Sequence, residues 1–244
     1  WYIPWMALTD AQDQPLIAKH QLGLSSSLSL AGALLKKPPM PAPAGKKPQV
    51  QIFADPDGSL PHARQEGTDL ASLALNIGTW EPVLHTGKEA LETTFKAQAD
   101  KNTPGILHFA THGILDSANP LFSFLLLQGG ERDDGRLEIL EIANEVNLRS
   151  ASLAVLSACN TAMGAVSGGN EMVCLQQSFH EAGVPTILAS LWEVSDEATS
   201  RLMSGFYQKL FKGVPVGQAL TETVRSMTTE NPSRWAAFQI YGAP

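Results

Sequence analysis

His112 and Cys159 are the two residues of this 244-residue chain whose types could together perform nucleophilic catalysis. Each directly follows an apolar run, ILHFAT (106–111) before the histidine and LAVLSA (153–158) before the cysteine. An imidazole beside a thiol favours the reactive thiolate and can later protonate a leaving amine, which is cysteine protease chemistry. Spacing alone leaves a second interpretation open, in which Cys159 is a small buried hydrophobic residue, as free cysteines often are.

Backbone amides next to this pair could stabilise a reaction intermediate. Gly113 follows His112 directly, and a glycine lets the backbone approach a substrate closely. We expect the amides of Gly113 and Cys159 to form an oxyanion hole, in which one donor contributes about 3–4 kcal/mol.

A third apolar run, TILASLW (186–192), leads to two acidic residues, Glu193 and Asp196. One interpretation is that these carboxylates bind the substrate. The other is that they begin a helix capped by Ser195, since a helix N-terminus favours negative charge. The sequence by itself does not separate the two.

Other reactive side chains favour structural roles. His108 and His112 are four residues apart, as a metal pair on a helix would be, but they lie on a strand pattern and no third ligand is near. We therefore predict no metal site, and we place His108 in the core. Cys174 lies in the middle of a helical pattern and is the better core cysteine. The chain has no Gly-rich phosphate loop, and we expect no cofactor.

Composition excludes several classes of protein. The formal net charge is −7 and no basic stripe is present, which argues against a direct nucleic-acid partner. No apolar run approaches the roughly 20 residues of a membrane-spanning helix. The chain has two cysteines, which suits a reducing compartment, so we expect a cytoplasmic location. It starts at Trp1, inside an apolar run, which favours a piece cut from a longer protein.

The elements that must position these residues alternate along the chain. Strands are predicted near 50–54, 80–84, 106–111, 122–127 (two short segments), 153–157, 186–192 and 235–241, and helices near 70–77, 89–98, 137–146, 172–182, 195–213 and 216–224. This alternation implies an α/β fold with a mostly parallel sheet and helices on both faces. Binding sites in such sheets form beyond the carboxyl ends of strands, where His112, Cys159 and Glu193 all fall.

We expect a single α/β domain in three parts. Residues 1–35 form an extended N-terminal segment of that domain, with a turn at 10–13. Residues 36–48 (KKPPMPAPAGKKP) form a Pro/Lys-rich surface loop. Residues 49–244 form the core.

Several motifs, taken in order, resemble the CHAT domain family. They are HFATHG at 108–113, NPL at 119–121, LSACNT at 156–161, SLWEVSDEAT at 190–199 and the ending at 235–242. CHAT domains are caspase-like, are often attached to tetratricopeptide repeats and are distant relatives of separase. The opening Ile3-Pro4 with Ala7-Leu8 is also similar to the family, so the resemblance covers nearly the whole chain.

The resemblance implies a caspase-like three-layer α/β/α sandwich and a cysteine endopeptidase that cleaves a protein partner. His112 is then the general base and acid, and Cys159 is the nucleophile. By similarity to separase, whose specificity pocket is acidic, Asp196 is expected to bind a basic side chain before the scissile bond, with Glu193 in reserve.

The family also implies regulation by an upstream tetratricopeptide repeat region or another partner. One departure is Gly168-Gly169-Asn170-Glu171, where many relatives have Gly-Gly-Glu-Gly, which bears on substrate fit. The alternative function is a catalytically silent CHAT fold that serves as an interaction module. Intact His112 and Cys159 argue against it.

Overall fold

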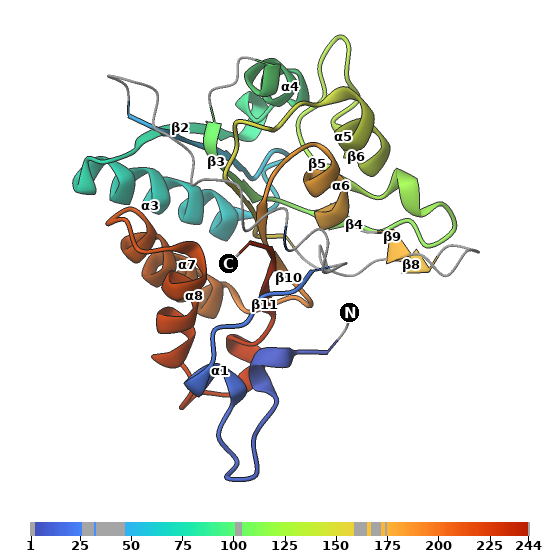
Figure 1. Ribbon diagram of the computed structural model, residues 1–244. Helices are drawn as coiled ribbons and strands as arrows, with labels where there is room; N and C mark the ends of the chain where they lie inside the picture. Colours follow the sequence, from blue (N-terminus) through green and yellow to red (C-terminus); the bar gives the residue numbers. More distant parts are fainter. Residues whose placement is uncertain are drawn as a thin grey trace.

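The computed structural model describes residues 3–25, 32, 47–100, 104–158, 165–166, 172–173 and 175–243. Its centre is a six-stranded sheet with strand order β11-β10-β7-β3-β1-β2 (Figure 1). The strands are β1 (Gln49–Ala54), β2 (Glu81–Thr86), β3 (Pro104–Ala110), β7 (Leu153–Leu156), β10 (Thr186–Ser190) and β11 (Phe238–Gly242). All neighbouring pairs are parallel except β10 and β11, which are antiparallel. The mostly parallel sheet is confirmed.

Helices cover both faces of this sheet. One layer contains α3 (Pro61–Ile77), α7 (Asp196–Leu210) and α8 (Val216–Arg225), and the other contains α4 (Glu92–Asp100), α5 (Ile139–Glu145) and α6 (Leu175–Glu181) (Figure 1). Successive strand residues point to opposite faces. On β3, Ile106 and Ala110 therefore join the apolar cluster beneath α7, while Leu107 and Phe109 join the cluster beneath α6. The three-layer sandwich is confirmed.

The helix that follows β1 has clear sequence signals at both ends. Proline is at the first position of α3, where the missing N–H costs nothing. Gly78 ends the helix with φ of 80°, a left-handed conformation that glycine adopts without strain. Leu70 and Ala74 are buried on the inner face of α3, as the predicted helical spacing requires.

A small antiparallel sheet follows His112 in the chain. It contains β4 (Gly113–Ile114), β5 (Phe124–Leu126) and β6 (Arg136–Glu138), with the 3-10 turn η3 (Pro120–Phe122) between the first two. Only one strand, β5, lies within the two extended segments predicted near 122–127. The helix predicted from 137 begins later, at Ile139, because Leu137 and Glu138 pair with β5. Glu138 and Glu141 then form a capping box at the start of α5.

The region after β7 also differs from the prediction. Residues 172–173, expected in a helix, form strand β9 (Met172–Val173), which pairs with β8 (Ala165–Val166). Helix α6 begins after them, at Leu175. Cross-strand pairing, which a local pattern does not reveal, decides both boundaries.

The N-terminal segment, expected as short extended pieces with a turn, also contains the 3-10 helix η1 (Trp5–Ala7) and the short helix α1 (Leu16–Lys19). The turn predicted at 10–13 is present. Met6 and Ile17 are buried in the apolar cluster beneath α7 and α8, which supports assigning the segment to the same domain. Residues 36–46 of the predicted loop lie outside the described residues. The remaining short turns are η2 (Gly87–Glu89) and η4 (Pro232–Arg234).

Candidate active site

Four neighbouring strands end at the same edge of the sheet. β10, β7, β3 and β1 are adjacent in that order, and their carboxyl ends meet at this edge. A cleft of about 540 Å³ lies there. Its lining includes Ser59, Thr111, His112, Ser157, Ala158, Ser190, Trp192 and Glu193. The structure thus brings His112 together with Glu193 and with the two residues that precede Cys159. Cys159 itself lies outside the described residues.

The backbone of His112 is held between the end of β3 and the small sheet. The Leu126 amide donates to the His112 carbonyl at 2.9 Å, and the Thr111 hydroxyl donates to the Leu126 carbonyl at 2.7 Å. Gly113 continues into β4, where it pairs with Leu125. The side chain of His112 is 39% exposed, so its imidazole is open to the cleft.

The imidazole contacts two residues that follow β1. Its Nε2 lies 2.8 Å from the Ser59 hydroxyl oxygen, and that hydroxyl donates to Asp57 Oδ1 at 2.8 Å. The other carboxylate oxygen, Asp57 Oδ2, is 3.9 Å from Nε2. Burial raises the pKa of Asp57, but hydrogen bonds from Ser59 and the charge of His112 outweigh it, so this pKa falls below its ordinary 3.8.

These contacts define the tautomer of His112. A carboxylate can only accept hydrogen bonds, so the single hydroxyl proton of Ser59 points to Asp57. The Ser59 oxygen must therefore accept a hydrogen bond from Nε2–H of His112. Nδ1 then carries the lone pair and can take up a proton.

Asp55 fixes the loop that carries these two residues. It is buried at 1% exposure and has φ of 50°, a left-handed conformation that aspartate tolerates better than most residues. Its carboxylate accepts from the Leu60 amide at 2.8 Å and from Arg64 Nε at 2.9 Å. The loop is thereby closed against the start of α3.

The end of β7 is anchored to its neighbour β10. The Ser190 hydroxyl donates to the carbonyl of Ala158 at 2.7 Å, and both residues are buried. Because Ala158 directly precedes Cys159, this bond fixes the backbone immediately before the predicted nucleophile.

The two predicted acids, Glu193 and Asp196, lie just before and at the start of α7. Glu193 is exposed and lines the cleft, beside Trp192, whose indole donates to the Ser233 carbonyl at 3.0 Å. Asp196 begins α7, and nothing is described of its side chain. Ser195 occupies the predicted N-cap position, but its side chain makes no capping hydrogen bond.

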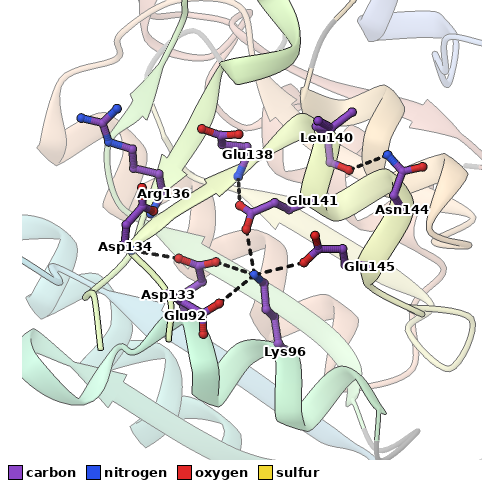
Figure 2. Close-up of polar contacts among 11 residues, drawn as sticks. Glu92, Lys96, Asp133, Asp134, Arg136, Glu138, Leu140, Glu141, Asn144 and Glu145 are labelled. Carbon is purple, nitrogen blue, oxygen red and sulfur yellow. Dashed lines mark hydrogen bonds and ion pairs between the residues drawn. The ribbon is translucent and has the colours of Figure 1, made fainter. Parts of the chain in front are cut away.

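The remaining candidates are a core histidine and an acidic cluster. His108 is fully buried, which confirms its predicted place in the core, and Cys174 lies outside the described residues. In the part of the chain that the structure describes, one group of carboxylates is close enough to hold a cation: Glu92, Asp133 and Glu141. Figure 2 shows the ammonium of Lys96 at its centre, 2.7–2.9 Å from each of these carboxylates.

Sequence reasoning missed Asp57 and Ser59. Residues 55–58 (DPDG) carry a strong turn signal, which by itself accounts for polar residues at these positions. The sequence therefore offered no separate reason to place them in the site. The available clue was position, because polar residues just beyond a buried strand lie at the same edge as the other strand ends.

The fold of this chain is similar to the folds of known structures, at low sequence identity. No curated protein matches the chain. Separase in the Saccharomyces cerevisiae separase–securin complex is 16% identical with a TM-score of 0.65, covering 100% of this chain and 14% of that one. The Arg-specific cysteine proteinase gingipain R is 11% identical with a TM-score of 0.55, covering 80% of this chain and 46% of that one.

These similarities show the fold, and the chain spans less than half the length of either structure. Among the described helices, none has the length and apolar character needed to cross a bilayer. A model of the CHAT domain family matches residues 1–243, nearly the full length of the sequence. The chain therefore belongs to the CHAT domain family, with a caspase-like fold.

Proposed function

We propose that this domain is a cysteine endopeptidase in which Cys159 is the nucleophile and His112 the general base and acid. One observation carries the proposal: Ser157 and Ala158, the residues directly before Cys159, line the same cleft as His112. The thiol and the imidazole would then meet at the rim formed by neighbouring strands β7 and β3.

The hydrogen bonds of His112 suggest how the reaction would proceed. Nδ1 accepts the thiol proton, since Nε2–H is already committed to Ser59, and the thiolate attacks the scissile carbonyl carbon. The amides of Gly113 and Cys159 bind the oxyanion. His112 then gives its proton to the leaving amine, and water hydrolyses the thioester. Asp57, 3.9 Å away, stabilises the imidazolium in between.

Substrate preference and regulation extend this proposal. A basic residue before the scissile bond would be recognised by Asp196, with Glu193 as the second candidate. Glu193 lines the cleft, and no lysine or arginine is among the described residues that do so, which supports a preference for cations. Separase was crystallised with securin, so control by a protein partner or an upstream repeat region is part of the proposal.

A catalytically silent interaction module is the alternative function. One observation favours it: several large apolar side chains are exposed around β4 and η3, next to His112. They are Ile114 (36%), Leu115 (36%), Leu121 (46%) and Phe122 (47%). Exposed apolar groups of this kind often mark protein contacts. They serve a peptidase equally well, as a surface that receives a protein substrate.

Labelling with an electrophilic peptide probe tests the two functions. We expect the probe to modify Cys159, and Cys159→Ala to abolish both labelling and peptide cleavage while the thermal unfolding midpoint stays the same. Cys174→Ala is the matched control and should leave both signals intact. Unimpaired cleavage by Cys159→Ala would exclude this nucleophile. No labelling and no turnover of a broad peptide library, even in the full-length parent protein, would favour the interaction module.

A further inference from the structure

A second cavity adjoins the cleft on the α3 side of the sheet. It has a volume of about 160 Å³ and lies between α3 and α7, which are neighbours in Figure 1. Glu66 and Ser200 line both this cavity and the cleft, so the two lie next to each other along the helices. For comparison, an engineered apolar cavity of about 150 Å³ admits benzene, so a long side chain is of suitable size.

The inner end of this cavity contains a buried polar cluster. The Nδ1 atom of His108 lies 2.9 Å from the Tyr207 hydroxyl, and Nε2 lies 3.0 Å from Glu66 Oε1. The second pair does not have hydrogen-bond geometry, so Glu66 Oε1 and His108 Nε2 are buried without a hydrogen bond among the described residues. Buried polar atoms in native proteins usually have partners, and these two face a cavity.

The charge of the cavity is negative. Burial, together with the charge of Glu66, raises the pKa of Tyr207 well above its ordinary 10.0, so its hydroxyl stays neutral. Glu66, with an 11% exposed side chain, and the exposed Asp69 are the carboxylates that line the cavity. No described residue lining the cavity or the cleft is lysine or arginine.

We propose that this cavity binds a cationic side chain, lysine or arginine, of the peptide held in the cleft, with Glu66 as its main counterion. Leu70, Leu73 and Met203 also line the cavity and would pack against the aliphatic stem of that side chain. Asp69 would attract the cation at the mouth. The inference rests on the proposed endopeptidase function and adds a specificity residue on α3 to the two acids that follow β10.

Peptide binding to the Cys159→Ala protein tests this assignment without requiring cleavage. Two peptide libraries are compared by fluorescence anisotropy, identical except that one position holds arginine in the first and neutral citrulline in the second. We expect arginine peptides to bind about 10- to 100-fold more tightly, as a charge-assisted hydrogen bond implies. Glu66→Gln should remove most of this difference, and the part that remains would come from Asp196 and Glu193. Glu181→Gln on α6, in the opposite helix layer, is the control and should keep it.

The small cation agmatine tests whether the ligand of the cavity is a side chain of the bound peptide or a free small molecule. Agmatine should bind the protein by calorimetry, bind more weakly after Glu66→Gln, and compete with arginine peptides. Agmatine that binds at Glu66 without displacing peptide would overturn the assignment to a substrate side chain. Arginine preference unchanged by Glu66→Gln, or no binding of either ligand, would overturn the pocket itself. If arginine peptides still bind more tightly than citrulline peptides but the electrophilic probe does not label Cys159, the proposed peptidase function is refuted. The assignment of the cation-binding cavity would then still hold.

Discussion

The hydroxyl oxygen of Ser59 lies 2.8 Å from Nε2 of His112, although 53 residues separate them in the chain. The Ser59 hydroxyl in turn donates a hydrogen bond to the carboxylate of Asp57. The imidazole is therefore oriented by a two-residue chain from the loop after β1. In the proposed reaction, this arrangement leaves Nδ1 as the nitrogen that would accept the thiol proton.

Ser59→Ala should lower kcat about 10- to 100-fold with little change in KM, because His112 would lose the acceptor that fixes its tautomer. Asp57→Asn should have a similar effect, and the double variant should lose little more, since the two residues act as one unit. Ser72→Ala, which removes a serine hydroxyl from the exposed face of α3, is the control. Additive losses, or an unchanged pH–rate profile in Ser59→Ala, would show that the contact is only structural.

Ser190→Ala should destabilise the domain by about 0.5–1.5 kcal/mol, because the hydrogen bond from the serine hydroxyl to the buried Ala158 carbonyl would be lost. It should also slow alkylation of Cys159 by iodoacetamide. Ser152→Ala is a matched control, since Ser152 makes a similar bond to the Gly105 carbonyl at the opposite end of β7. Equal slowing by both variants would mean that Ser190 contributes stability alone. Urea unfolding and alkylation rates measure the two effects.

Lys96→Met should destabilise the domain by about 3–5 kcal/mol, because it would leave the carboxylates of Figure 2, including the buried Glu92, without their cation. Lys88→Met, at an exposed lysine, is the control and should cost little. Urea unfolding of the three proteins gives the comparison.

Lys96 also predicts that the domain loses stability at alkaline pH. Burial lowers the pKa of Lys96, but hydrogen bonds to Glu141, Glu92 and Asp133 raise it above its ordinary 10.5. The folded state therefore holds this proton more tightly than the unfolded state does, and the stabilisation is complete below pH 10.5 and lost as pH rises beyond it. The parent protein should lose more stability than Lys96→Met between pH 10 and pH 12. Parallel curves would contradict the network.

His180 predicts that the domain loses stability at acidic pH, because its pKa is lowered on folding rather than raised. Burial lowers its pKa below 6.5, although its ring donates from Nδ1 to the Val184 carbonyl at 2.8 Å. Below pH 6.5 the unfolded chain takes up a proton that the folded chain resists, so stability falls by at most about 1.4 kcal/mol per pH unit. His180→Gln should flatten the curve between pH 7 and 5, whereas His20→Gln, at an exposed histidine, should not.

Local patterns in the sequence predicted much of the scaffold. Strands β1, β3, β7 and β10 all end in apolar runs that a sheet must bury, and their alternation with helices implied parallel pairing. The boundaries that failed, at 137–138 and 172–173, are residues paired with another strand. A helical pattern cannot reveal such pairing, because the partner is remote or the connecting segment gives no turn signal.

The sequence by itself determined the kinds of chemistry present: an imidazole, a thiol and two acids, each just beyond a buried strand. Strand order, which only the tertiary structure decided, placed β1 beside β3 and so brought Ser59 and Asp57 to His112. It also placed Glu66 of α3 against His108 and Tyr207. The physical reason is that strand order and helix packing minimise the free energy of the whole core, and no local window of residues contains that information.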